Sequence, residues 1–177
     1  MNQVRVMIFI DGSNLFWACK TISFKIDFEK LKNVLADGRY LIRPFYYCAI
    51  PEKPNTKQVN FLRMLRYLGF EVVTKTLKRR ISSDGRIFFV EKGVDVALVT
   101  DMLSMAFKNA YDVAVLVSGD NDYIRAVEEI KRLGKRVEIA SFEHNPEDNT
   151  KFISADLKMV ADKFISLDKI KDKIRKD

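Results

Sequence analysis

Short apolar runs alternate along the chain with segments in which apolar residues recur every three or four positions. Runs rich in Val, Ile, Phe and Tyr predict strands, because these residues suit a pleated backbone with buried side chains. The predicted strands cover residues 4–10, 43–49, 70–74, 112–117 and 136–140. Helical spacing predicts helices over residues 27–36, 56–68, 94–108 and 123–133. Gly69 and Gly134 follow two of these helices, at the position where a left-handed residue commonly ends a helix.

This alternation of strands and helices is typical of an α/β fold. Three of the strands are apolar on both faces, as in a mainly parallel sheet that helices cover on each side. We expect one domain over residues 1–167. Residues 168–177 alternate Lys and Asp around two isoleucines, which predicts a charged C-terminal tail, either a frayed helix or a loose segment.

One segment interrupts the alternation, "KTLKRRISSDGRIFFVEKG" at residues 75–93. Its Ser-Asp-Gly turn lies between two strand-like arms and predicts a protruding hairpin. The positive residues in it are Lys75, Lys78, Arg79, Arg80 and Arg86, and Phe88 and Phe89 add aromatic surface. Two interpretations remain open: a hairpin that binds an RNA backbone, or a solvated edge hairpin whose charges prevent edge pairing.

Composition narrows the class of protein. The chain is 47% hydrophobic and 31% charged, as in ordinary globular proteins, and its apolar runs are too short to span a membrane. No secretory signal pattern is present, so we expect a cytoplasmic location. Cys19 and Cys48 lack metal-ligand spacing, which predicts two buried thiols. The net charge of +7 favours a polyanionic partner such as nucleic acid.

Acidic residues follow two of the predicted strands. The first strand ends at Asp11, and Ser13 and Asn14 open the next segment; the fourth strand is followed by Asp120 and Asp122. In an open parallel sheet, ligands collect at the carboxyl ends of the strands. The three carboxylates therefore converge if these two strands are neighbours in the sheet.

A further carboxylate opens the predicted helix over residues 94–108. Asp95 and Met102 are seven positions apart, so the helix presents both on one side, and we expect Asp95 to face inward. A buried carboxylate needs a partner, either a metal ion or a cation such as Lys92. Asp101 points about 120° away from Asp95 around the helix, so one face cannot present both.

Clustered carboxylates suit Mg²⁺ or Mn²⁺, which lower the pKa of bound water and stabilise the leaving oxygen in phosphodiester hydrolysis. Each aspartate also has a simpler explanation. Asp11 can cap the following turn, Asp122 can cap the helix from Tyr123, and Asp95 can offset the helix dipole. His144, the only histidine, lies in a polar loop and is expected to be a bystander.

The chain lacks the sequence motifs of several other kinds of binding or catalytic site. The chain has neither G-x-G-x-x-G after its first strand nor a G-K-[ST] motif, so we expect no nucleotide cofactor. "DGSNL" lacks the second serine of the D-x-S-x-S adhesion site, because Leu15 stands there. A phosphatase with a D-x-D nucleophile would need an acid in place of Ser13.

Three segments resemble the NYN domain, the LabA-like branch of the PIN-like nuclease superfamily. They are "FIDGSN" at 9–14, "KGVDVALVTDML" at 92–103 and "LVSGDNDYIRAVEEIKRLGKRVEIASF" at 116–142. The resemblance implies a three-layer α/β/α, Rossmann-like sandwich, a divalent-metal site and an RNA substrate. The family's acids fall on Asp11, Asp95, Asp120 and Asp122, and Asn14 and Ser118 match polar positions beside the metal. Asp101 also matches a recurring position, whereas the basic hairpin has no counterpart in the catalytic pattern.

The first hypothesis is therefore a ribonuclease that depends on Mg²⁺ or Mn²⁺. In it, Asp11, Asp95 and Asp120 hold the metal and Asp122 assists or positions water. Asn14 and Ser118 contact the phosphate, and Lys78, Arg79, Arg80 and Arg86 hold the RNA backbone. The alternatives are an RNA- or protein-binding regulatory module with little turnover, and a small-molecule phosphohydrolase. A homo-oligomer is compatible with all three.

Overall fold

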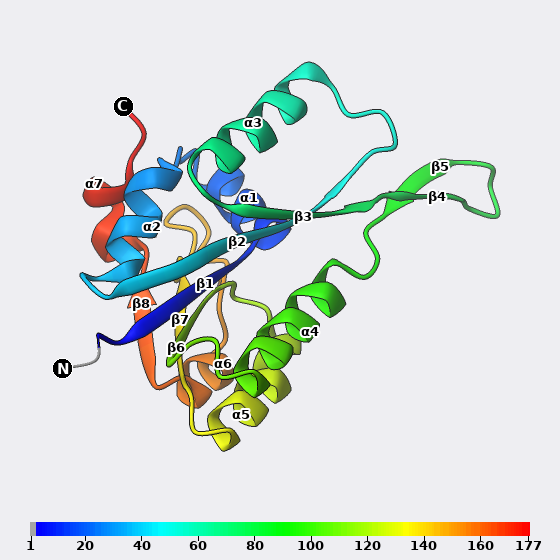
Figure 1. The fold of residues 1–177 in the computed structure, drawn as a ribbon. Helices are drawn as coiled ribbons and strands as arrows, with labels where there is room; N and C mark the ends of the chain where they lie inside the picture. Colours follow the sequence, from blue (N-terminus) through cyan, green and yellow to red (C-terminus); the bar gives the residue numbers. More distant parts are fainter. Residues whose placement is uncertain (1–2) are drawn as a thin grey trace.

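The computed structural model describes residues 3–177 and has a six-stranded sheet between two layers of helices (Figure 1). The strands of this sheet are β1 (Arg5–Asp11), β2 (Tyr40–Ile50), β3 (Glu71–Thr76), β6 (Val113–Val117), β7 (Arg136–Ser141) and β8 (Lys163–Ser166). Their order is β3-β2-β1-β6-β7-β8, and each neighbouring pair is parallel. The predicted α/β fold with a parallel sheet is confirmed.

Helices cover both faces of the sheet. One face carries α1 (Gly12–Thr21), α2 (Phe28–Ala36), α3 (Thr56–Tyr67) and α7 (Lys171–Ile174). The other face carries α4 (Val94–Phe107), α5 (Ile124–Arg132) and α6 (Ala155–Val160). Short 3-10 turns, η1 (Asn121–Tyr123) and η2 (Asp168–Ile170), precede α5 and α7. No helix within residues 3–177 is long and apolar enough to cross a membrane.

The two hydrophobic cores follow from the alternation of side chains along a strand. In β1, Val6, Ile8 and Ile10 point to the first helical layer, whereas Met7 and Phe9 point to the second. All five are almost completely buried. Because successive strand residues point to opposite faces, a continuous apolar run serves both cores at once.

The predicted elements are all present, and their ends shift by a few residues. Gly69 and Gly134 have φ values of 86° and 76°, as expected for residues that end a helix in the left-handed region. The sequence interpretation missed β8 because it has only four residues and lies at the sheet edge, where only Ser166 of the four is buried.

The C-terminal segment is more ordered than expected. Ile174 is fully buried, and its carbonyl accepts a hydrogen bond from the N–H of Asp27 at 2.8 Å. The N–H of Lys176 donates to the carbonyl of Lys25 at 3.0 Å. The expectation of a frayed or loose tail is corrected, because one apolar side chain and backbone pairing with residues 25–27 hold this segment against the body.

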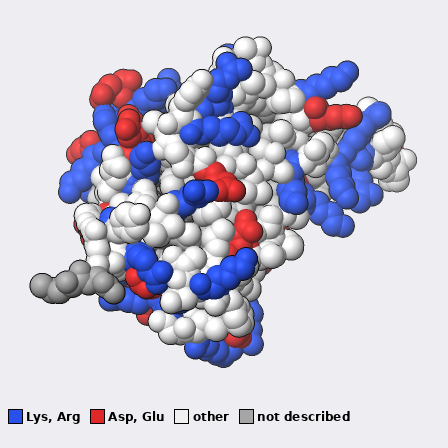
Figure 2. Space-filling view, viewed as in Figure 1, with Lys and Arg blue, Asp and Glu red and all other residues white. Residues whose placement is uncertain are grey.

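The segment after β3 forms the expected hairpin. Strands β4 (Lys78–Ile81) and β5 (Ile87–Val90) pair antiparallel in a separate two-stranded sheet. This hairpin extends well beyond the body of the molecule (Figure 1). Figure 2 shows Lys and Arg side chains gathered over it. Its tip contains one ion pair, between Arg86 Nε and Asp84 Oδ2 at 3.0 Å, in which both side chains remain exposed.

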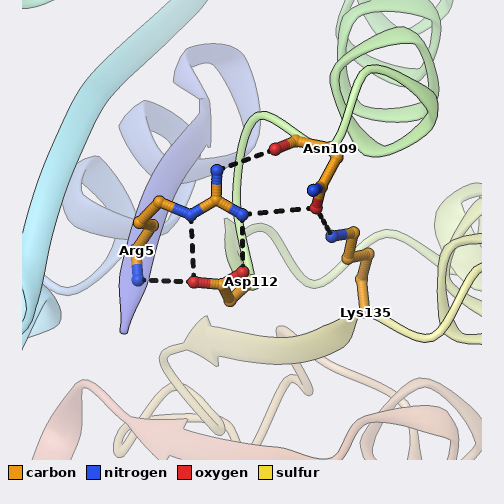
Figure 3. A network of polar contacts seen from close by, with 4 residues as sticks. All are labelled: Arg5, Asn109, Asp112 and Lys135. Atoms are coloured by element: carbon orange, nitrogen blue, oxygen red, sulfur yellow. Dashed lines mark hydrogen bonds and ion pairs between the residues drawn. The ribbon is translucent and has the colours of Figure 1, made fainter. Parts of the chain in front are cut away.

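At the amino edge of the sheet, one carboxylate joins the starts of β1 and β6 (Figure 3). Asp112 accepts hydrogen bonds from the backbone N–H of Arg5 at 2.8 Å and from its guanidinium at 2.7 and 3.1 Å. The guanidinium also donates to the carbonyl of Asn109 at 2.8 Å, and Lys135 donates to the Asn109 side chain. Hydrogen bonds from Arg5 lower the pKa of Asp112 from 3.8 to about 2.

We predict that Asp112→Asn lowers the melting temperature at pH 7 by about 2–4 °C, because the neutral amide cannot replace the charge-assisted contacts with Arg5. The depressed pKa means that the carboxylate stabilises the fold above its ordinary pKa of 3.8 and loses this effect as the pH falls toward 2. Thermal melts at pH 7 and at low pH measure the difference. Glu52→Gln, at an exposed loop position, is the control. An equal loss of melting temperature at both pH values would contradict a stabilising role of the ionised Asp112.

Candidate active site

The direction of the chain across the sheet reverses between β1 and β6. From β1 the chain adds β2 and then β3 on one side, and it later places β6, β7 and β8 on the other. Such a reversal leaves a crevice at the carboxyl ends of the two central strands. Asp11 ends β1 at this crevice, and Ser118 directly follows β6.

Asp11 is buried and lies at the centre of a hydrogen-bond network. Its Oδ2 accepts from the hydroxyl of Ser118 at 3.1 Å and from that of Tyr123 at 3.0 Å. Its Oδ1 accepts from the backbone N–H of Asn14 at 3.1 Å, so Asp11 caps α1, as the simpler interpretation expected. Burial raises the pKa of Asp11; the hydrogen bonds oppose this rise, and the charge of Asp120 adds to it.

A second set of contacts fixes the loop after β6. The side-chain oxygen of Asn14 accepts from the N–H of Gly119 at 3.0 Å, and Ser118 Oγ accepts from the N–H of Asp120 at 3.2 Å. Asp120 Oδ1 in turn accepts from the N–H of Asp122 at 3.0 Å. The cap of the turn that leads into α5 is therefore Asp120, and the simpler alternative, in which Asp122 caps this helix, is wrong.

Two glycines let the backbone approach closely at the crevice. A Cβ on Gly119 would lie 1.7 Å from the carbonyl oxygen of Phe152, and one on Gly12 would lie 2.5 Å from the Tyr46 ring. Both contacts are shorter than atoms tolerate. The glycines of "DGSN" and "SGDND" are thus required by packing beside the two acidic strand ends.

Asp95 lies at the crevice, but it is exposed rather than buried as expected. It lies on the same stripe of α4 as Met102, but Met102 is fully buried and Asp95 is exposed. Asp95 belongs to the first turn of the helix, at the carboxyl edge of the sheet. The prediction of an inward, buried carboxylate is corrected: Asp95 borders an open pocket.

We call this cavity of about 370 Å³ the acidic pocket. Four carboxylates, three polar side chains and one indole line it: Asp11, Ser13, Asn14, Trp17, Glu91, Asp95, Asp120 and Tyr123. Within the described residues, the lining contains no Lys or Arg, so no basic side chain offsets the four acids there. The expected cation Lys92 is exposed and does not line the pocket.

Sequence reasoning did not assign four lining residues of the acidic pocket to the site: Ser13, Trp17, Glu91 and Tyr123. Glu91, just before α4, accepts a hydrogen bond from Ser13 Oγ at 2.6 Å and so joins the base of the hairpin to α1. Tyr123 donates to Asp11, and burial raises its pKa, which keeps the phenol protonated. Trp17 packs edge-on against Phe152 with ring centroids 5.2 Å apart. Among these residues, only Glu91 could have been predicted from the sequence, because it lies between the hairpin and the helix that carries Asp95.

Other candidate residues lie outside the acidic pocket. The side chain of Asp122 is exposed and does not line it. Asp101 accepts a hydrogen bond from the hydroxyl of Tyr47 at 2.9 Å, which agrees with its offset from Asp95 around α4. Ser118 contacts the pocket only through Asp11 and Asp120, since its side chain is buried. The structure therefore brings together Asp11, Asn14, Asp95 and Asp120 and leaves the others aside.

The four carboxylates border the acidic pocket without converging on one point. Within residues 3–177, no group of three or more His, Cys, Asp or Glu side chains is placed to ligate a metal ion directly. Each acid nevertheless has acceptor capacity left, since an ionised carboxylate offers about four lone-pair sites. Glu91 and Asp120, for example, each use one oxygen for the hydrogen bonds described above.

A larger and mainly apolar cavity, of about 550 Å³, lies on the other side of α1. Leu15, Phe16 and Cys19 contribute to its wall, and no carboxylate lines it. Cys19 and Cys48 are only partly buried, which corrects the expectation of buried thiols. Burial still raises their pKa values, to about 12 and about 11, so both remain protonated at neutral pH. The hard oxygen ligands thus belong to the acidic pocket alone among these two cavities.

The chain is similar in sequence and in structure to known proteins. The chain is 29% identical over 175 residues to the low amplitude and bright protein LabA of Synechococcus elongatus, covering 97% of this chain and 88% of LabA. The crystal structure of a protein of unknown function from Vibrio parahaemolyticus has 25% identity and a TM-score of 0.77, with coverage of 98% of this chain and 97% of that one. The NYN domain profile matches residues 5–168, which include both acidic strand ends and the hairpin. The chain therefore belongs to the NYN domain family.

Proposed function

We propose that this protein is a divalent-metal-dependent ribonuclease that hydrolyses RNA phosphodiester bonds at the acidic pocket. The observation that carries the proposal is the set of four carboxylates, Asp11, Glu91, Asp95 and Asp120, around one pocket at the switch point of the sheet. The NYN domain is a PIN-like nuclease family, which supports the same reaction class.

The residues of the acidic pocket fit Mg²⁺ or Mn²⁺ by their chemistry. Carboxylates are the hard oxygen ligands that these ions prefer, and Mg²⁺ usually keeps several waters when one or two carboxylates bind it. The pocket of about 370 Å³ has room for an ion with such waters, at about 30 Å³ for each water. A hydrated ion thus suits acids that border the pocket without converging. When bound, it would supply an activated water and stabilise the charge on the phosphate.

The proposed roles of the side chains follow from their positions. Asp11, Asp95 and Asp120 would hold the ion, with Glu91 as a fourth acid on the rim. Asn14 would face the phosphate from the start of α1. The buried Ser118 and Tyr123 would act through Asp11, which they hold by hydrogen bonds. Asp122 would support the site through its backbone N–H, which holds the carboxylate of Asp120.

The hairpin supplies the positive charge that the acidic pocket lacks. All four residues of β4, including Lys78, Arg79 and Arg80, are exposed. Arg86 is also exposed, and its exposed pair with Asp84 is weak enough for a phosphate to replace. We propose that these four cations hold the RNA backbone, while the acids stay free for the metal.

One observation favours a second candidate function. Since the described acids are not placed to ligate a metal directly, an RNA- or protein-binding regulatory module with little or no turnover also fits the structure. Such a module would use the same hairpin and would not depend on the ionised state of the acidic pocket. Metal binding and cleavage separate the two functions.

We predict that Asp120→Asn reduces metal-dependent RNA cleavage by about 100-fold or more and leaves RNA binding unchanged. Asparagine caps a helical turn as well as aspartate does, so the fold is retained. Asp122→Asn is the matched control two residues away, and it should reduce cleavage by less than about tenfold, since its side chain does not line the pocket. Single-turnover cleavage of a labelled RNA measures both. Equal losses of cleavage in the two variants would contradict the specific role of Asp120 in the acidic pocket.

We also predict that Mn²⁺ stabilises the protein against heat. An ion that binds only the folded state at about 100 times its Kd raises the melting temperature by about 5–10 °C for a chain of this size. Asp120→Asn should lose most of this shift, whereas Asp101→Asn should keep it, because Asp101 lies outside the acidic pocket. No shift in the unmodified protein would favour the binding module.

The hairpin generates a prediction about salt. Replacing Lys78, Arg79 and Arg80 together by Gln should reduce the slope of log Kd against log salt by about 2 for single-stranded RNA, since each phosphate contact contributes about 0.7. Replacing the exposed Lys169, Lys173 and Lys176, which lie at the other end of the molecule from the hairpin, provides the control. Binding is measured without divalent ions. If both triple variants change the slope alike, or neither changes it, the hairpin is not the RNA-binding surface, as the small-molecule phosphohydrolase would predict.

A further inference from the structure

The hairpin is a two-stranded ribbon with little else packed against it. Strands β4 and β5 pair with each other and not with the six-stranded sheet. Of their eight residues, only Val90 is partly covered, and Ile81, Ile87, Phe88 and Phe89 are between 46% and 64% exposed. Two-stranded hairpins are marginally stable by themselves in water. Such an amount of exposed apolar surface on a marginal element indicates a binding surface rather than a structural one.

The register of the strands gives the ribbon two chemically different faces. Residues directly opposite each other in an antiparallel pair share a face, and successive residues alternate. Lys78 pairs with Val90 and Arg80 with Phe88, and these four residues form one face, the cationic face. The opposite, apolar face contains Arg79, Ile81, Ile87 and Phe89, since Arg79 pairs with Phe89 and Ile81 with Ile87.

The cationic face combines the two contacts that bind single-stranded nucleic acid. Lys78 and Arg80 offer positive charge to phosphates, and Phe88, directly across from Arg80, offers an aromatic ring that is part of a 46% exposed residue. Stacking on an aromatic ring requires a base that is not already stacked inside a duplex. On the apolar face, a single cation stands among three large apolar side chains, which suits a polyanion less well.

The hairpin also leads directly to the acidic pocket. Val90 ends β5, and the next residue is Glu91, which lines the pocket and is hydrogen-bonded to Ser13. Four residues of strand span about 13 Å, so the ring of Phe88 lies within the reach of a few nucleotides from the acids. An RNA strand held on the hairpin therefore needs only a few nucleotides to reach the pocket.

We propose that Phe88 stacks against an unpaired RNA base, with Lys78 and Arg80 on adjacent phosphates, and that the cationic face thereby selects single-stranded over double-stranded RNA. This inference rests on the proposed function, because it places the substrate of the same site. It adds a specificity-determining residue, Phe88, and assigns the stacked base to the cationic face, while Arg79 and Arg86 contact other phosphates of the same RNA strand.

The test compares Phe88→Ala with Phe89→Ala, a matched control that removes an exposed ring from the adjacent position on the other face. Fluorescence anisotropy with a labelled oligoadenylate and with a duplex RNA of equal length, both in EDTA, measures binding without cleavage. Phe88→Ala should weaken single-strand binding by about 5- to 150-fold and leave duplex binding nearly unchanged. Phe88→Leu should show the same loss and Phe88→Tyr should restore binding, because stacking requires a ring. Circular dichroism melts verify that each variant folds.

The outcomes separate this inference from the proposed function. Equal losses in Phe88→Ala and Phe89→Ala, full binding by Phe88→Leu, or no binding of single-stranded RNA by the unmodified protein would each overturn the role of Phe88. Loss in Phe89→Ala alone would assign RNA to the apolar face and also overturn it. Cleavage of RNA in Mn²⁺ is measured separately. Phe88-dependent binding without any cleavage would contradict the ribonuclease and support the stacking face.

Discussion

The carboxylate of Asp11 is the contact on which the arrangement of the acidic pocket depends. It ends β1, caps α1 through the N–H of Asn14, and accepts hydrogen bonds from Ser118 after β6 and from Tyr123 before α5. One buried acid thus ties four elements together at the switch point. Burying a carboxylate is costly unless hydrogen bonds compensate, and these three do so only in part, since burial still raises its pKa.

The two ends of the β1–β6 pair use carboxylates in opposite ways. At the amino edge, Asp112 has a guanidinium partner and a depressed pKa, which serve stability. At the carboxyl edge, Asp11 has no cationic side chain beside it in the described lining of the pocket, and three further acids surround the same space. Carboxylates without a cationic partner are expected at functional sites, where a bound ligand supplies the missing positive charge. The NYN domain family to which the chain belongs is a nuclease family, which agrees with a functional site at the carboxyl edge.

Charge is divided in space between the acidic pocket and the hairpin. The acids of the pocket gather at the carboxyl edge of the sheet. The hairpin holds its cations on a ribbon that projects into solvent (Figures 1 and 2). Glu91 and its hydrogen bond to Ser13 join the two regions. This separation keeps the hairpin cations from neutralising the carboxylates, as the proposed function requires if the acids are to bind a metal and the cations phosphate.

The sequence by itself determined most of the elements and the two acidic strand ends, because hydrophobic period and the residues after each apolar run are local properties. Asp11, Asn14, Asp120 and the hairpin follow from that local pattern. Only the tertiary structure decided which side chains meet. Sequence spacing put Asp95 on the correct stripe of α4, but whether the first turn of that helix faces core or pocket depends on where the sheet ends. Glu91 and Tyr123 joined the site, and Ile174 was buried, through contacts between residues distant in sequence, which no local period records.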